Sequence, residues 1–207
     1  MLGLPSSTEV SRRMPKSAFY ENLKMDGALR SSFTQDVEGF TLRNSLKAAT
    51  LGVPDGERVH EVLVLEVACK ARYVPEDVLA AIVQANAHKL VFVCTFEDEE
   101  CTAVRIGKRL MVGEWAPAGS LRAVLDATSM DAVWDSLASS VIYGDAGRPG
   151  VSVEERVQRD EKIAKLREEC DRLDARCRKA GQPARKRELY EQWLKKHNEL
   201  KALEDEG

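Results

Sequence analysis

The chain has 207 residues, enough for one well-packed domain with an appendage but short for two full domains. Its net charge is only −3 at pH 7, which excludes a body that is basic throughout, so any nucleic-acid binding must come from a local patch. No apolar run approaches the roughly 20 residues needed to cross a bilayer, and we expect no contact with membranes.

Residues 1–38 are predicted to form a helical segment that packs on the rest of the protein. The spacing of Ser6-Ser7-Thr8-Glu9 is that of a capping box, which predicts a short helix that ends or kinks at Pro15. A second helix follows. A third is predicted to begin at Asp26, a favourable N-cap, and to end at Gly39.

Residues 39–143 are predicted to form an α+β body, in which a mixed sheet is flanked by helices. Apolar residues alternate over residues 59–71, which predicts a long strand, and residues 90–96 are apolar on both faces, which predicts a central one. Further strands are predicted over residues 40–48, on both sides of Gly107 and over residues 121–127, with helices starting at Pro75 and Ser129.

A Gly/Pro linker over residues 144–151 precedes residues 152–207, which are predicted to form an antiparallel helical hairpin, or coiled coil. The first helix contributes apolar residues at steps of three and four: Ile163, Leu166, Cys170, Leu173 and Cys177. The pattern breaks at Ala180-Gly181-Gln182-Pro183, because Gly and Pro end helices. The second helix contributes the facing residues of the predicted seam: Leu189, Trp193, Leu200 and Leu203.

Six cations surround this break, and no acidic residue lies between Asp174 and Glu188 to balance them. We call these six residues the basic tip: Arg176, Arg178, Lys179, Arg185, Lys186 and Arg187. The first three end a helix, where positive charge is favourable, whereas the last three open one, where it is mildly unfavourable. The basic tip is therefore the candidate nucleic-acid contact. Arg12, Arg13 and Lys16 form a smaller basic cluster.

Three apolar residues of the hairpin, Tyr190, Leu194 and Val157, lie off the predicted seam. Leftover apolar groups of this kind indicate a partner, so we expect these three residues to form an interface. Its occupant is either a second copy of the chain, giving a homodimer, or a different protein.

No catalytic, metal or cofactor site is predicted. Glu66 and Lys70 share one strand face but lie roughly 13 Å apart along it, too far to serve one metal ion. The acidic run Glu97-Asp98-Glu99-Glu100 lacks the spacing of a calcium loop and is interpreted as a charged turn. The five cysteines and three histidines lack zinc-site spacing, and the cysteines are interpreted as buried hydrophobes of a cytoplasmic protein.

Several fragments resemble landmarks of one bacterial family: Gly3-Leu4-Pro5, Ser7-Thr8-Glu9-Val10, Pro15-Lys16, Tyr20, Trp115, Trp134, Gln182-Pro183 and Arg185-Lys186. The family is classed as domain of unknown function 4391, and the resemblance covers essentially the whole chain. It implies no catalytic residues, because the family has no established activity. It does imply an association with DNA methyltransferases and helicases of restriction-like or anti-phage systems, beside which its members tend to be encoded.

These observations favour a non-catalytic accessory subunit of a bacterial DNA-modification, restriction-like or anti-phage defence assembly. On this interpretation the body docks on a larger helicase or methyltransferase subunit, and the basic tip contacts DNA or RNA. The main alternative is a protein–protein adaptor with no nucleic-acid contact. A third is an undescribed metal-dependent nuclease, whose acidic groups only folding would bring together.

Overall fold

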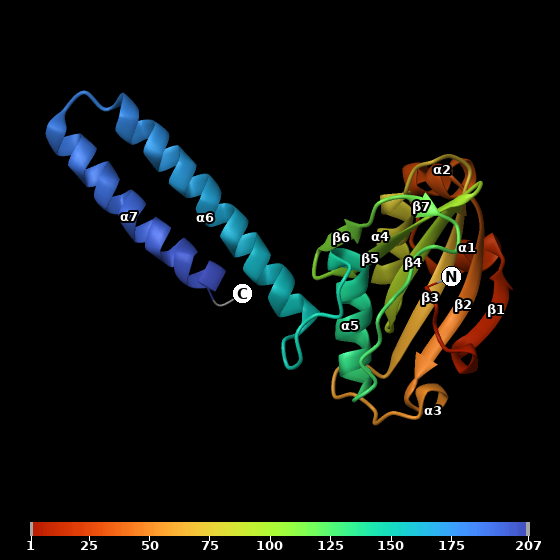
Figure 1. Ribbon diagram of the computed structural model, residues 1–207. Helices are drawn as coiled ribbons and strands as arrows, with labels where there is room; N and C mark the ends of the chain where they lie inside the picture. Colours follow the sequence, from red (N-terminus) through yellow and green to blue (C-terminus); the bar gives the residue numbers. More distant parts are fainter. Residues whose placement is uncertain (1, 206–207) are drawn as a thin grey trace. The chain divides into compact units, whose positions relative to one another are not determined.

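The computed structural model describes residues 2–205, and the chain divides into two compact units between Val153 and Glu154. The first unit is an α+β fold built on one mixed sheet, and the second is an antiparallel helical hairpin (Figure 1). Both features were predicted from the sequence. Each unit is described by itself below.

The sheet of the first unit is mostly antiparallel. Its strands are β1 (Glu9–Met14), β2 (Val37–Lys47), β3 (Glu61–Cys69), β4 (Lys89–Phe96), β5 (Glu99–Ile106), β6 (Arg109–Val112) and β7 (Ala116–Pro117). Strands β1 to β6 follow one another across the sheet in chain order, and β7 pairs with β5. Among the strands of residues 2–205, only β3 and β4 run parallel, and the chain between them forms the crossover helix α4 (Glu76–Gln84).

Helices cover both faces of this sheet (Figure 1). Besides α4, they are α1 (Lys16–Asn22), α2 (Gly27–Gln35) and α5 (Met130–Tyr143). The short α3 (Ala48–Leu51) follows the end of β2, and a 3₁₀ turn, η1, spans Ser6–Thr8. Phe19 of α1, Phe33 of α2 and Phe40 of β2 pack together, with ring centroids 4.4–5.9 Å apart. Helix α5 buries Met130, Val133, Trp134 and Leu137, with Trp134 only 1% exposed. Burial of large aromatic side chains of this kind stabilises the fold.

The helix predicted before Pro15 is wrong, because residues 9–14 form the edge strand β1. The hydroxyl of Thr8 donates to the Pro5 carbonyl at 2.7 Å and accepts from the Asn44 amide of β2 at 2.9 Å. These bonds tie the predicted capping-box residues to β2 as a 3₁₀ turn. Strand β1 then pairs with β2 through a bulge, in which Ser11 has a φ of 48°.

Helix α2 begins as predicted but ends earlier. The Asp26 side chain accepts a hydrogen bond from the Leu29 backbone amide at 2.8 Å, the geometry of an N-cap. The helix ends at Gln35, and Gly39, the predicted end, lies inside β2.

The strand predicted over residues 121–127 is also wrong, because this segment runs along the protein without regular structure. Its backbone amides donate to other groups instead of to a neighbouring strand: Ala123 donates to the Leu2 carbonyl at 2.9 Å, and the other hydrogen bonds of these amides go to side chains. Val124 donates to the Ser140 hydroxyl at 2.9 Å, and Asp126 donates to the Ser136 hydroxyl at 2.8 Å. Side chains of α5 therefore satisfy the amides that a strand ladder would have used.

Asp131, in the first turn of α5, anchors the loop that precedes β3. Its carboxylate accepts hydrogen bonds from the backbone amides of Glu57 at 2.9 Å, Arg58 at 3.1 Å and Val59 at 2.9 Å. Bonds of an amide to an ionised carboxylate are stronger than those to a neutral acceptor.

We expect Asp131→Ala to lower the free energy of unfolding by about 2 kcal/mol, because three amides lose a charged acceptor. Asp131→Asn should cost less, since its remaining amide oxygen can still accept from Arg58 and Val59. Urea unfolding of the two variants and the wild type measures the difference. Three equal midpoints would contradict the anchoring role.

Candidate nucleic-acid interface

The second unit consists of α6 (Val153–Lys179) and α7 (Pro183–Asp205), joined by the short connection that was predicted from Gly181 and Pro183. Leu166, Cys170 and Leu200 are buried between the two helices. Half-buried residues pack against them: Ile163, Trp193 and Leu203. These contacts confirm the centre of the predicted seam.

Ion pairs between the two helices neutralise cations along the hairpin. They are Lys162–Glu199 at 3.1 Å, Arg167–Glu204 at 2.7 Å and Lys196–Glu169 at 3.0 Å. The hydrogen bond from Lys162 lowers the pKa of the Glu199 carboxyl, which therefore stays ionised beside its partner. Exposed pairs of this kind contribute little to stability, but they leave these cations balanced.

The basic tip is balanced only in part. All six of its residues are exposed, and they flank the connection between α6 and α7. Arg178 pairs with Asp174 at 2.5 Å, and Arg185 pairs with Glu188 at 2.6 Å. Within residues 2–205, four cations of the tip form no ion pair: Arg176, Lys179, Lys186 and Arg187.

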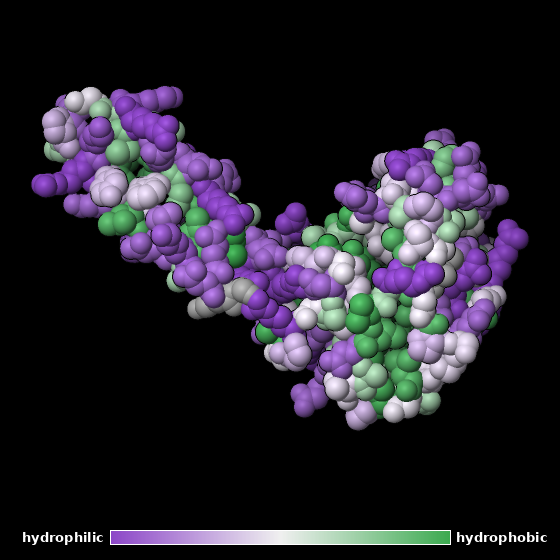
Figure 2. Space-filling view, in the orientation of Figure 1, coloured by the Kyte–Doolittle hydropathy of each residue, from purple (hydrophilic) through white to green (hydrophobic). Residues whose placement is uncertain are grey.

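Hydrophilic side chains accordingly surround the end of the hairpin where α6 meets α7, whereas hydrophobic ones gather between the helices (Figure 2). Arg185, Lys186 and Arg187 lie at the N-terminus of α7, where the unpaired backbone amides already favour an anion. This end of the hairpin is therefore suited to phosphate or carboxylate groups.

Two of the three predicted interface residues lie on the surface. Tyr190 is 53% exposed and Leu194 is 41% exposed. Val157 is 5% exposed, so it is not part of this exposed apolar surface, contrary to the prediction that it is left over for a partner.

Three aromatic rings stack along α7, a feature that the sequence analysis did not predict. The rings of Tyr190 and Trp193 lie 5.7 Å apart at an interplanar angle of 21°, and those of Trp193 and His197 lie 4.6 Å apart at 12°. Their spacing of three and four residues was the available signal. It was missed because Trp193 was assigned to the seam alone.

The first unit does not bring the suspected nuclease residues together. Glu66 forms an ion pair with Arg43 of β2 at 2.5 Å, whereas the Lys70 ammonium donates to the Thr34 carbonyl at 2.8 Å. Over residues 2–205, the structure contains no group of three or more His, Cys, Asp or Glu side chains suited to a metal ion. In the acidic run, Glu99 and Glu100 belong to β5, and Arg72 lowers the pKa of Glu99 through a hydrogen bond.

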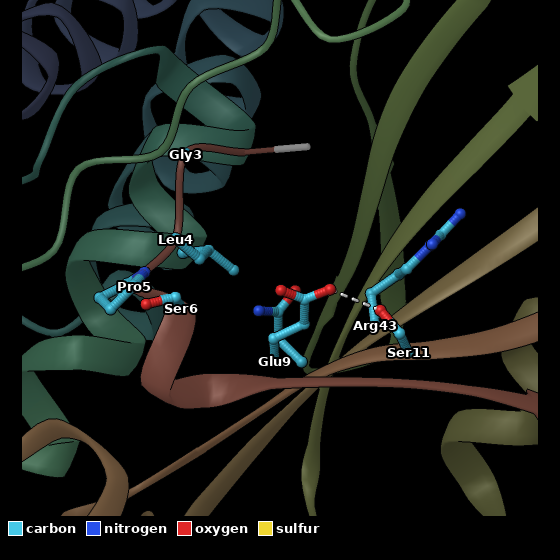
Figure 3. Close-up of a pocket in the computed structure, with 8 residues that line it drawn as sticks. Gly3, Leu4, Pro5, Ser6, Glu9, Ser11 and Arg43 are labelled. Atoms are coloured by element: carbon cyan, nitrogen blue, oxygen red, sulfur yellow. Dashed lines mark hydrogen bonds between the residues drawn. The ribbon is translucent and has the colours of Figure 1, made fainter.

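An open pocket of about 450 Å³ lies beside β1 and β2 (Figure 3). Its lining residues are Gly3, Leu4, Pro5, Ser6, Glu9, Ser11, Arg43 and Asn44. Glu9 accepts a hydrogen bond from the Ser11 hydroxyl at 2.8 Å, and Arg43 is occupied by Glu66. These charged groups are therefore already satisfied within the protein, which distinguishes the pocket from the basic tip.

The family model that describes a domain of unknown function (DUF4391) matches residues 2–200. The chain is a member of this family, and the match spans both units, so the hairpin is part of what the family shares. Searches of curated proteins and of solved structures found no match to the chain. None of the helices within residues 2–205 combines the length and apolar composition that crossing a membrane requires.

Proposed function

We propose that this protein is a non-catalytic accessory subunit that contacts nucleic acid through the basic tip. One observation carries the proposal. Lys162, Arg167 and Lys196 form ion pairs between the helices, whereas four cations gather around the connection of α6 and α7, exposed and outside the ion pairs within residues 2–205: Arg176, Lys179, Lys186 and Arg187. A row of phosphates is a ligand whose charge matches such a cluster.

The placement of two of these cations supports a bound anion. Lys186 and Arg187 lie in the first turns of α7, where positive charge is unfavourable for the helix itself. A phosphate at this end would be attracted both by the side chains and by the free backbone amides of the first turn. The basic tip therefore costs the free protein some stability that a phosphate ligand would restore.

The proposed partner is a larger helicase or methyltransferase subunit of a DNA-modification, restriction-like or anti-phage assembly. Support for it comes from the gene neighbourhood that the family resemblance implies. In such an assembly the first unit would dock on the larger subunit, and the hairpin would reach nucleic acid.

The test compares two triple variants that remove the same charge. Lys179→Ala/Lys186→Ala/Arg187→Ala removes cations of the basic tip, and Lys162→Ala/Arg167→Ala/Lys196→Ala removes ion-paired cations along the hairpin. For duplex DNA, the tip variant should lower the slope of log affinity against log salt by up to about 3 units, near 0.9 per lost contact. The control variant should keep the wild-type slope.

Fluorescence anisotropy between about 50 and 200 mM salt measures these slopes. Affinity should fall equally for duplexes of different sequence, because phosphate contacts do not read bases. If the wild type binds no nucleic acid at low salt, alone or with the neighbouring gene products, the proposal fails. The adaptor with an acidic protein partner would then be the better interpretation.

A further inference from the structure

We propose that the nucleic acid bound by the basic tip is single-stranded and that the Tyr190 ring stacks on one of its bases. This inference rests on the proposed function, because it assigns a class of nucleic acid to the same end of the hairpin. It is carried by a different observation, the stack of rings along α7.

The ring stack and Lys186 of the basic tip lie on one face of α7. Lys186, Tyr190, Trp193 and His197 follow at steps of four, three and four residues, which places them on a single stripe of the helix. Tyr190 is the ring nearest to the tip and is 53% exposed. A strand whose phosphates lie over Lys186 would therefore bring its bases towards Tyr190.

The lower part of the stack is held in place. Trp193 packs against the buried cluster of the hairpin seam, and the His197 ring lies against it, 4.6 Å away. Tyr190 thus rests on a platform that is ordered before any ligand binds. A base that joins this stack orders little of the protein, which lowers the entropy cost of binding.

Stacking on a side chain favours an unpaired base over a duplex. In a duplex each base is already stacked on its neighbours, whereas a single strand can turn a base outwards onto an aromatic ring. Every base has such a face, so the contact tolerates any sequence. The combination of cations and an exposed ring is therefore typical of single-strand binding.

Charges in the groove beside the stack limit where phosphates can lie. This groove, about 490 Å³ in volume, is lined by Trp193 and His197 of α7 and by charged residues of α6: Arg167, Asp171, Asp174 and Arg178. Arg167 pairs with Glu204 and Arg178 pairs with Asp174, so neither arginine of the groove is an unpaired cation for a phosphate, and Asp171 adds negative charge. The backbone of the strand is thus expected over the basic tip, with only a base reaching the ring of Tyr190.

The competing occupant of this face is a second copy of the chain or another protein, which would also use the neighbouring Leu194. Three substitutions distinguish the two. Tyr190→Leu keeps apolar area but removes the ring, Tyr190→Phe keeps the ring, and Leu194→Ala removes apolar area without touching the stack. Each is tested on the full chain with a 20-nucleotide oligothymidine and with a mixed 20-base-pair duplex.

We expect the wild type to prefer the single strand. Tyr190→Leu should weaken single-strand binding at least about fivefold and leave duplex binding and the salt slope unchanged, because stacking involves no phosphate. Tyr190→Phe and Leu194→Ala should bind as the wild type does.

Other outcomes separate this inference from the proposed function. Equal affinity for both probes, with no effect of Tyr190→Leu, would overturn the single-strand inference while the salt-dependent tip binding stands. Binding of neither probe would overturn both. If Leu194→Ala instead abolishes self-association in light scattering, while Tyr190→Leu leaves binding of the oligothymidine intact, the face belongs to a second copy.

Discussion

Replacing Leu166 with Asp should lower the free energy of unfolding of the hairpin by about 3–5 kcal/mol, because it buries an unpaired charge. Leu166 is 4% exposed and lies in the seam with Cys170 and Leu200. The seam is one narrow row of side chains, so no second apolar layer can compensate for its loss. Thermal melts followed by the helical circular dichroism signal measure the change.

Leu194→Asp is the matched control, since Leu194 lies on the same hairpin but is 41% exposed. We expect it to change stability by no more than about 0.5 kcal/mol. Superimposable melting curves of Leu166→Asp and the wild type would show that the two helices do not depend on this seam.

Replacing Phe92 with Ala should destabilise the first unit by about 3–5 kcal/mol, through lost burial and the cavity that remains. Phe92 is fully buried in β4, the strand that joins the parallel pair to the antiparallel part of the sheet. Phe96→Ala, at the half-buried end of the same strand, should cost clearly less. Urea unfolding should show a lower midpoint for Phe92→Ala, and equal midpoints for the two variants would contradict this ranking.

Elements with a strong local pattern were predictable from the sequence. The apolar run over residues 90–96 predicted β4, which buries Phe92, and Ser129 predicted the start of α5. The hairpin turns where Gly181 and Pro183 interrupt its helices. In each case the residues that decide the structure lie within a few positions of one another. Periodicity therefore contains the information that is needed.

Two segments were mispredicted because distant side chains decide their structure. Strand β1 depends on pairing with β2 and on the bond between Thr8 and Asn44, which are 36 positions apart. The segment 121–127 alternates like a strand, yet its Val124 and Asp126 amides donate hydrogen bonds to the hydroxyls of Ser140 and Ser136 in α5. No local pattern contains these partners.

The composition of the basic tip was readable from the sequence, but its charge balance was not. Whether Arg178 and Arg185 are neutralised depends on which side chains reach Asp174 and Glu188. The smaller basic cluster shows the same limit. The Lys16 ammonium donates to the carbonyl of Phe33 in the last turn of α2 and to that of Val37 at the start of β2, and burial lowers its pKa. Lys16 therefore binds backbone carbonyls at the end of α2 and is not available as a free cation.

The bulge in β1 has a consequence for how this protein behaves at high concentration. An edge strand offers unpaired amides and carbonyls on which a strand of another molecule can be added. Strand β1 lies at one edge of the sheet. In its middle Ser11 departs from the extended conformation, and the exposed residues Arg12 and Arg13 follow directly. A neighbouring strand would meet an interrupted hydrogen-bonding ladder and two like charges. The open edge of the sheet is thereby protected against aggregation.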